Sequence, residues 1–266
     1  MKKGKSFICL LGVLFSAILL NSCQTDDYLI DGGKSNPYFE GTVMEYLESR
    51  KDLFEDLVTV IKLTKWKDIF SDENSELTFF APTDFSIDRS VDNLNRYLYD
   101  MAGLDKITDL SQVKPKVWED MIGMYVVEGK YRLNDIAQID TVALSTFPGQ
   151  TNYTYDKTYK LTMGVCYGDA NGIKYAGYRQ IMCANQDYGI PIYAYVASCN
   201  IEPHNGIVHV LRFDHIFGYS AITFRQRAIE AGISYPKEES LQTGGGSEDL
   251  SLTNSVKEKN VSIIKE

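Results

Sequence analysis

The feature that most constrains the fold is a change of pattern near residue 125 of the 266-residue chain. Before it, apolar residues such as Leu53, Leu57 and Ile61 recur at three- and four-residue steps, which is the period of an amphipathic helix. From residue 139 on, short apolar runs alternate with turn sequences such as "PGQ", "GDANG" and "NQDYG", which indicates β-strands. Helices followed by a run of strands predict an α+β fold, with a helical N-terminal half packed on a β-structure.

The expected elements follow from the same patterns. Residues 38–70 predict helices, and 77–81 predicts a buried strand that ends at Pro82 because proline cannot donate to a sheet ladder. A helix follows, which Asp84 or Ser86 can cap. A further helix is expected over roughly 112–124, and the final strand over 207–213.

The N-terminus has the parts of a secretory signal. Three lysines open the chain, an apolar run follows from Phe7 to Leu20, and small polar residues lead to Cys23. The apolar run is short of the roughly 20 residues that a membrane span needs, although an uncleaved anchor helix is the alternative. "LLNSC" resembles a bacterial lipobox, which implies that Cys23 is acylated and anchors the chain in a membrane. Asp26 and Asp27 resemble an export tag, which implies an outer-membrane location facing the cell exterior.

The charge of the chain excludes some partners. Removal of residues 1–22, which hold three lysines and no acidic residue, changes the formal net charge from −9 to −12. We expect no nucleic-acid partner, because phosphate contacts with basic residues supply most of that affinity. The glycine-rich segment from 236 to 266 has few large apolar side chains and is expected to be mostly disordered.

Metal and catalytic motifs are not evident. All three histidines, His204, His209 and His215, fall in "EPHNGIVHVLRFDHIF" (202–217), but strand spacing separates His209 and His215 by about 20 Å, which argues against a joint metal site. The sequence contains no GxSxG, HExxH or P-loop pattern, so we expect no enzymatic activity and no cofactor.

The cysteines Cys166, Cys183 and Cys199 allow at most one disulfide. The simpler interpretation is that they are small residues buried in strands.

Two stretches resemble the signatures of the fasciclin (FAS1) domain family. "LTFFAPTDFSI" at 77–87 resembles the first signature, and "SCNIEPHNGIVHVLRFDHIF" at 198–217 resembles the second. The resemblance covers about 38–219. The matching positions are Thr78, Phe80, Ala81, Pro82, Thr83 and Asp84 in the first signature and Asn205, Gly206, Val208, His209 and Val210 in the second.

The resemblance implies a FAS1-like β-sandwich or wedge and a structural role for these residues, with His209 in the core. Two departures stand out. "MYVVEGKY" places Met124 and Tyr125 where the family often has a Tyr-His pair tied to adhesive contacts, and Arg212 replaces the second signature's aspartate. We divide the chain into a signal peptide (1–22), an acylated Cys23 with a flexible tether (23–37), a FAS1 domain (38–220) and a short helix with a mostly disordered tail (221–266).

Tyrosines are dense between residues 153 and 195. Tyrosine favours strands, so sheet packing explains many of them, whereas exposed aromatic clusters mark contact surfaces. The candidate ligand contacts are Tyr153, Tyr155, Tyr175, Tyr178 and Tyr188. The sequence therefore predicts a lipid-anchored outer-membrane adhesion or binding protein whose partner is an extracellular or outer-membrane protein or a glycan. The alternative is an accessory glycan-capture or structural subunit of a polysaccharide-uptake complex.

Overall fold

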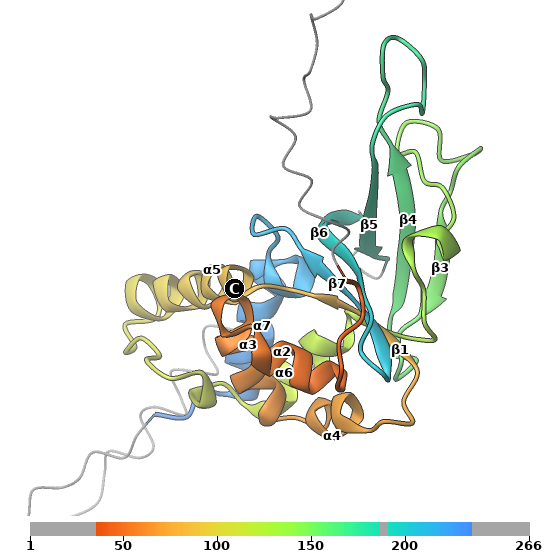
Figure 1. The fold of residues 1–266 in the computed structure, drawn as a ribbon. Helices are drawn as coiled ribbons and strands as arrows, with labels where there is room; N and C mark the ends of the chain where they lie inside the picture. Colours follow the sequence, from red (N-terminus) through yellow and green to blue (C-terminus); the bar gives the residue numbers. More distant parts are fainter. Residues whose placement is uncertain (1–35, 187–190, 236–266) are drawn as a thin grey trace, which may run out of the picture. The chain divides into compact units, whose positions relative to one another are not determined.

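A computed structural model describes residues 36–186 and 191–235 of the chain (Figure 1). The chain divides into two compact units, Met1–Ile233 and Ser234–Glu266. Every helix and strand reported below belongs to the first unit. The predicted signal peptide, Cys23, most of the tether, Tyr188 and the tail from residue 236 lie outside the described residues.

Helices dominate the first half of the described chain and strands the second. The helices are α2 (Val43–Ser49), α3 (Lys51–Lys62), α4 (Trp66–Ser71), α5 (Asp84–Arg96), α6 (Pro115–Gly123) and α7 (Ala221–Ala231). Shorter helical turns are η2 (Tyr97–Met101), η3 (Leu110–Gln112), η4 (Leu133–Asp135) and η5 (Phe217–Tyr219). The strands are β1 (Leu77–Ala81), β2 (Val126–Glu128), β3 (Gln150–Tyr153), β4 (Lys160–Tyr167), β5 (Arg179–Asn185), β6 (Ile192–Ile201) and β7 (Gly206–Leu211).

The seven strands form one sheet in the order β2-β1-β7-β6-β5-β4-β3. All neighbouring strands are antiparallel except β1 and β7, which are parallel and lie in the part of the sheet that the helices cover. In Figure 1 the strands β3, β4 and β5 extend away from the helices as a ribbon. Strand β7 is buried along its whole length, and β4 and β5 are also mostly buried, so many exposed residues of the ribbon lie in the loop between β4 and β5.

The two edges of the sheet approach each other. Val127, in edge strand β2, pairs with Thr154, the residue that follows edge strand β3, and the Tyr155 amide donates to the Val126 carbonyl at 2.7 Å. The sheet therefore curls toward a closed wedge, and the side chains that it encloses include Leu161, Met163 and Val165. The predicted α+β fold class, with a helical half packed on a wedge of strands, is confirmed.

Local sequence explains where the first helices begin. Thr42 and Glu45 form a reciprocal capping box at the start of α2, which satisfies amides that lack a partner within the helix. In α3, Leu57, Val60 and Ile61 lie on one face and are fully buried. The helix is broken at Phe54, whose backbone is non-helical (φ −137°, ψ 23°), and the second part of α3 therefore begins with amides that need a new acceptor.

Asp84 supplies such an acceptor, which corrects the predicted cap of α5. Its Oδ1 accepts a hydrogen bond from the Leu57 amide at 3.0 Å, so the carboxylate caps the interrupted helix α3. Burial raises the pKa of Asp84, although the hydrogen bonds from α3 oppose that shift. Thr83 occupies the N-cap position of α5 and makes no capping hydrogen bond, and the Ser86 hydroxyl is buried without a partner.

Both ends of the predicted FAS1 domain are visible in the structure. The bridge between Tyr38 and Glu202 ties the start of the domain to the end of β6. At the other end, α7 places Phe224 and Ala228 in the core, so the compact unit continues past residue 220 to Ile233. Strand β7 ends at Leu211, two residues before the predicted end of the final strand at 213.

Candidate functional site

The three histidines have separate environments. His209 is fully buried on β7, where Nδ1 accepts from the Asn200 amide at 3.2 Å and Nε2 donates to the Tyr131 carbonyl at 2.9 Å. His215 is also buried, and its Nε2 forms a hydrogen bond with the Tyr125 hydroxyl at 2.7 Å. His204 is exposed. The stretch that contains all the histidines therefore forms no common centre.

Burial keeps both core histidines neutral. Desolvation lowers the pKa of His209 to about 4, against the opposing effect of the Tyr131 carbonyl, and the pKa of His215 to about 3. In the described part of the chain, no group of three or more His, Cys, Asp or Glu residues could hold a metal ion. Neither histidine has the combination of accessibility and a near-neutral pKa that a general base needs.

The signature residues form the centre of the fold. Strands β1 and β7 lie in parallel register, with Thr78 opposite Ile207 and Phe80 opposite His209, whose rings are 5.3 Å apart. The matching positions of both signatures are buried, apart from the half-buried Asp84. The residues on the strands are Thr78, Phe80, Ala81, Gly206, Val208, His209 and Val210, and those in the adjoining turns and helix start are Pro82, Thr83, Asp84 and Asn205.

Asn205 shows why the second signature needs an Asn-Gly pair. Its Oδ1 accepts from the Val43 amide at 2.8 Å, and its Nδ2 donates to the carbonyls of Phe70 and Asp72 at 3.0 and 2.8 Å. One buried side chain thus links the start of α2 to the end of α4. At the next residue, Gly206, a Cβ atom would lie 2.8 Å from the Leu77 carbonyl oxygen, so only glycine fits. These contacts are structural.

The departure at Tyr125 is also explained by packing. The Gly218 amide donates to the Tyr125 hydroxyl at 2.7 Å, and that hydroxyl forms a second hydrogen bond with His215 Nε2. The Tyr125 ring stacks on Tyr219, with centroids 5.0 Å apart. Tyr125 therefore fixes the segment after β7 from inside the core, where it is inaccessible to a partner. Arg212, the other departure, is exposed and forms an ion pair with Asp214 at 2.7 Å.

The structure separates the five candidate tyrosines. Tyr153 lies on β3 with an exposed side chain, and Tyr155 packs edge-on against the buried Trp66, with centroids 6.1 Å apart. Tyr175 and Tyr178 both lie in the loop between β4 and β5 and line the same groove. Tyr188 lies outside the described residues. Tyr167 and Tyr195, which the sequence did not single out as ligand contacts, line the groove as well.

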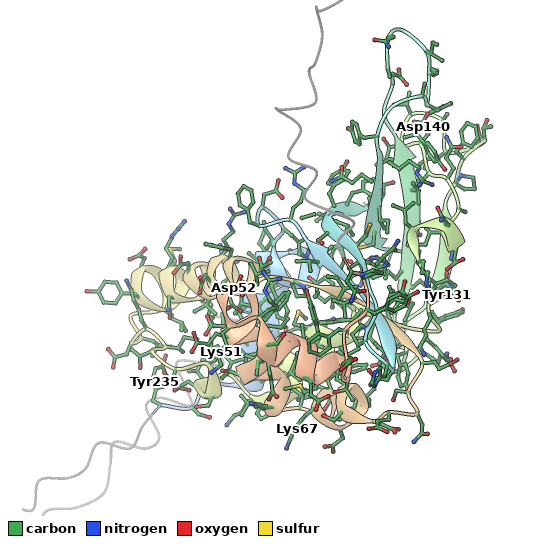
Figure 2. The ribbon with its side chains drawn as sticks, viewed as in Figure 1. Lys51, Asp52, Lys67, Tyr131, Asp140 and Tyr235 are labelled. Atoms are coloured by element: carbon green, nitrogen blue, oxygen red, sulfur yellow. The ribbon has the colours of Figure 1, made fainter. Side chains whose placement is uncertain are left out.

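This groove, which we call the ribbon groove, has a volume of about 460 Å³. Its floor is a face of the β4–β5–β6 sheet, because pairing places Cys166 opposite Gln180 and Met182 opposite Tyr195. One wall is formed by residues 139–142 and the far end by the loop between β4 and β5. Figure 2 shows Asp140, in the first of these walls, at the end of the ribbon that lies away from the helices.

Tyr178 presents an open aromatic surface in the groove. Its ring lies against Gly168, where a Cβ atom would be 2.7 Å from the ring, and its side chain is nevertheless 70% exposed. The backbone fixes this arrangement, because the Gly168 amide donates to the Tyr178 carbonyl at 2.8 Å and the Gly177 amide donates to the Gly168 carbonyl at 2.7 Å. One face of the ring is thus supported by glycine, while the side chain stays open to solvent.

Tyr175 is held in place by two carboxylates. Its hydroxyl donates to Asp140 Oδ2 at 2.8 Å, and its amide donates to Asp169 Oδ1 at 3.0 Å. The residue has a left-handed backbone (φ 61°), which is unfavourable for a bulky side chain and persists only where surrounding contacts enforce it. Phe147 packs against the edge of the ring, with centroids 5.4 Å apart.

The same hydrogen bond fixes the ionisation states in the groove. The Tyr175 hydroxyl lowers the pKa of Asp140, and Asp140 raises the pKa of Tyr175. At neutral pH the groove therefore offers an ionised carboxylate and a protonated phenol. Cys166 is unpaired, its thiol donates to the Gln180 carbonyl at 3.0 Å, and burial raises its pKa, which makes it a poor nucleophile.

The remaining cysteines are structural. Cys183 is buried on β5, and its thiol forms a hydrogen bond with the Tyr219 hydroxyl at 3.3 Å. Burial raises the pKa of this thiol to about 12. Cys199, on β6, is half-buried, and burial also raises its pKa. None of the three described cysteines is in a disulfide.

Within residues 36–186 and 191–235, no helix combines the length and the apolar character that crossing a membrane requires.

Comparisons with known proteins give a likeness in structure only. No family model matches the chain, and no curated protein matches it. Among solved structures, the chain is similar to a FAS1 domain pair from the insect cell adhesion molecule fasciclin I, with 16% sequence identity and a TM-score of 0.43. The match covers 64% of this chain and 49% of the other, so the chain spans about half of that structure's length. One fold can host unrelated functions, so this likeness does not assign a function to the chain.

Proposed function

We propose that this protein is a non-catalytic binding protein that holds an extracellular protein or glycan in the ribbon groove and so mediates adhesion. The observation that carries the proposal is the fixed aromatic pair in the groove, Tyr175 under backbone strain and Tyr178 supported on Gly168. Two aromatic side chains held in position lose little conformational freedom when a ligand binds, which favours affinity. The groove also has the mixture of aromatic and polar side chains that ligand sites use.

The non-catalytic part of the proposal rests on the chemistry of the groove. Its titratable groups are two aspartates, a lysine, a cysteine and tyrosines. The Asp140 carboxylate has its pKa lowered and the Cys166 thiol has its pKa raised, which makes Asp140 a weak base and Cys166 a weak nucleophile.

We also propose that the domain is FAS1-like. The support is the parallel pairing of β1 with β7, which brings the two signature segments side by side although they are more than 120 residues apart. Within that pair, each hydrogen-bonding signature residue has a structural partner: Thr78 donates to the Gly129 carbonyl, Asn205 links α2 to α4, and His209 donates to the Tyr131 carbonyl.

The proposed location is the outer membrane, with the domain outside the cell and held by acylated Cys23. This proposal rests on the sequence "LLNSC" and the following acidic pair. Residues 23–35 precede the described domain and can span at most about 45 Å when fully extended. In a strain that acylates lipoproteins, a fatty-acid analogue should label the wild type and not Cys23→Ala. Added protease should digest the domain on intact cells, and protection would contradict surface display.

Binding through the groove can be tested by adhesion. Cells that display the full chain are compared with cells that display Tyr178→Ala, on surfaces coated with extracellular matrix protein or with cell-envelope polysaccharide. We expect retention of the wild type on at least one coating and loss of most of it in the variant. Tyr153→Ala is the matched control, because Tyr153 is an exposed tyrosine of the same ribbon that does not line the groove. Equal retention of all three would contradict the proposal.

A second candidate function is an accessory glycan-capture subunit of an outer-membrane uptake complex. The observation that favours it is the presence of carboxylates, an amide and tyrosines in one groove, which suits hydroxyl-rich ligands. Cross-linking of intact outer membranes, followed by purification of the full chain, distinguishes the two functions. A stoichiometric transport protein in the purified material would favour the accessory role, and its absence would favour independent adhesion.

A further inference from the structure

We infer that the ribbon groove binds the rings of a neutral polysaccharide, with Tyr178 as the stacking platform and Asp140 and Asp169 as acceptors for sugar hydroxyls. This inference rests on the proposed binding function and names the ligand class. Sugar rings present apolar C–H faces and a rim of hydroxyls, so their sites need flat aromatic faces beside side chains that accept and donate hydrogen bonds. The ribbon groove contains both.

The aromatic part of the site is already organised. A ring that binds sugar must leave a face open and must resist collapse onto its neighbours. Tyr178 satisfies both conditions, because Gly168 supports its ring and the side chain is 70% exposed. Gly177 is required for the same arrangement, since a Cβ atom there would be 2.8 Å from the Gly168 carbonyl oxygen.

The polar part of the site is oriented by hydrogen bonds within the protein. Asp140 accepts from the Tyr175 hydroxyl and, through Oδ1, from the Val142 amide at 2.9 Å. Asp169 accepts from the Tyr175 amide. Each carboxylate oxygen has two lone pairs, so acceptor capacity remains for hydroxyl donors. Lys174, also in the groove, is a donor.

The charges of the groove disfavour an anionic ligand. Two carboxylates and one ammonium line the groove, which leaves no positive excess to attract a polyanion. A cationic ligand is disfavoured at two rings that already have cations beside them. Lys174 Nζ lies 5.5 Å from the Tyr175 ring centroid, and the Arg212 guanidinium lies 5.8 Å from that of Tyr195.

The groove is large enough to hold a sugar ring. Its volume of about 460 Å³ falls within the ~300–1,000 Å³ typical of small-molecule sites. A stable protein interface instead covers roughly 800 Å² on each partner, commonly on a flatter surface. A polysaccharide can place one or a few rings in the groove while the rest of its chain remains in solvent.

Affinity electrophoresis of the detergent-purified full chain tests this inference. The native gels contain, in turn, a neutral glucan, mannan, xylan or galactan, with the polyanion alginate as a charged comparison. We expect at least one neutral polymer to retard migration of the protein. Binding of that polymer, measured in solution, should persist in 0.5 M NaCl. Tyr178→Ala should weaken binding at least tenfold, and Tyr153→Ala should not.

Gly168→Ala tests the position of the ring without removing it. The added methyl group would displace the Tyr178 ring, and the backbone of Gly168 is not in the left-handed region, so the fold tolerates alanine. We expect binding to fall severalfold with unfolding unchanged. No retardation by any neutral polymer, retardation by alginate alone, or full binding by Tyr178→Ala would each overturn the inference. If Tyr178→Ala abolishes adhesion to protein coatings while no polysaccharide binds, the proposed binding function stands and the sugar inference fails.

Discussion

The centre of the sheet and the ribbon use the same residue types for opposite purposes. At the centre, Tyr125 is buried, its hydroxyl contacts both His215 and Gly218, and its ring is stacked. On the ribbon, Tyr178 has a supported ring and an open side chain, and the Tyr175 hydroxyl donates to the Asp140 carboxylate. The comparison teaches that residue type does not identify the site. The groove tyrosines differ from Tyr125 because they are held in position and are also at least partly exposed to solvent.

The largest expected effect is at the centre. Asn205→Ala removes three hydrogen bonds and leaves the Val43 amide and the carbonyls of Phe70 and Asp72 without their buried partner. We expect a loss of about 3–5 kcal/mol in the free energy of unfolding, measured by urea denaturation. Asn134→Ala, at an exposed asparagine, should cost less than about 0.5 kcal/mol. Similar losses in the two variants would mean that Asn205 does not hold the centre together.

The next effect is the dependence of stability on pH that arises from the two buried histidines of the centre. His209 and His215 have folded pKa values of about 4 and about 3, whereas a histidine in the unfolded chain titrates near 6.5. The unfolded state therefore binds more protons below pH 6.5. The contribution of each neutral histidine is fully present above that pH and is lost as the pH falls toward the folded pKa.

Between pH 6.5 and its folded pKa, each histidine should contribute a slope of about 1.4 kcal/mol per pH unit. Urea denaturation from pH 7 to pH 5 measures it. The slope should decrease by about that amount in His209→Gln and should be unchanged in His204→Gln, because His204 is exposed. A wild-type slope that matches His209→Gln would show that the core histidine is not held neutral.

The smallest effect is on the ribbon. Tyr175→Phe removes the hydrogen bond to Asp140, which is the main cause of that carboxylate's lowered pKa. We expect the pKa of Asp140 to rise toward its ordinary value in an NMR titration. Stability should fall by no more than about 1 kcal/mol, because the interaction is at the surface. An unchanged Asp140 pKa would show that the Tyr175 hydroxyl does not set it.

Sequence patterns predicted the fold better than the site. The helical period predicts the helices of the first half, and short apolar runs predict strands β1 and β7. The parallel pairing of these two strands was not predicted, because it joins residues such as Phe80 and His209 that are far apart in the sequence. The contact between Tyr125 and His215 was not predictable, since 90 residues separate them and their meeting depends on the turn after β7. The cap that Asp84 provides for α3 depends in the same way on packing between two helices.

The ribbon groove was only partly predictable. Tyrosine density indicated the region, but it grouped Tyr153 and Tyr155 with Tyr175 and Tyr178, although the structure separates them. Asp140 lies 35 residues before Tyr175, and no sequence period connects them. The one local signal was the turn "GDANG", which contains both Gly168 and Asp169, but its relation to the tyrosines appears only when the loop is folded.

The most direct test of binding in the ribbon groove is an NMR titration of the full chain in detergent. The ligand is a set of short oligosaccharides prepared from the neutral polysaccharide that retards the protein most in native gels. Aromatic ring signals are observed for Tyr178 and Tyr175 in the groove and for Phe80 and His209 at the centre. We predict that the groove signals shift with saturation while the centre signals stay fixed. Shifts at the centre without shifts at Tyr178 would contradict the assignment of binding to the ribbon groove.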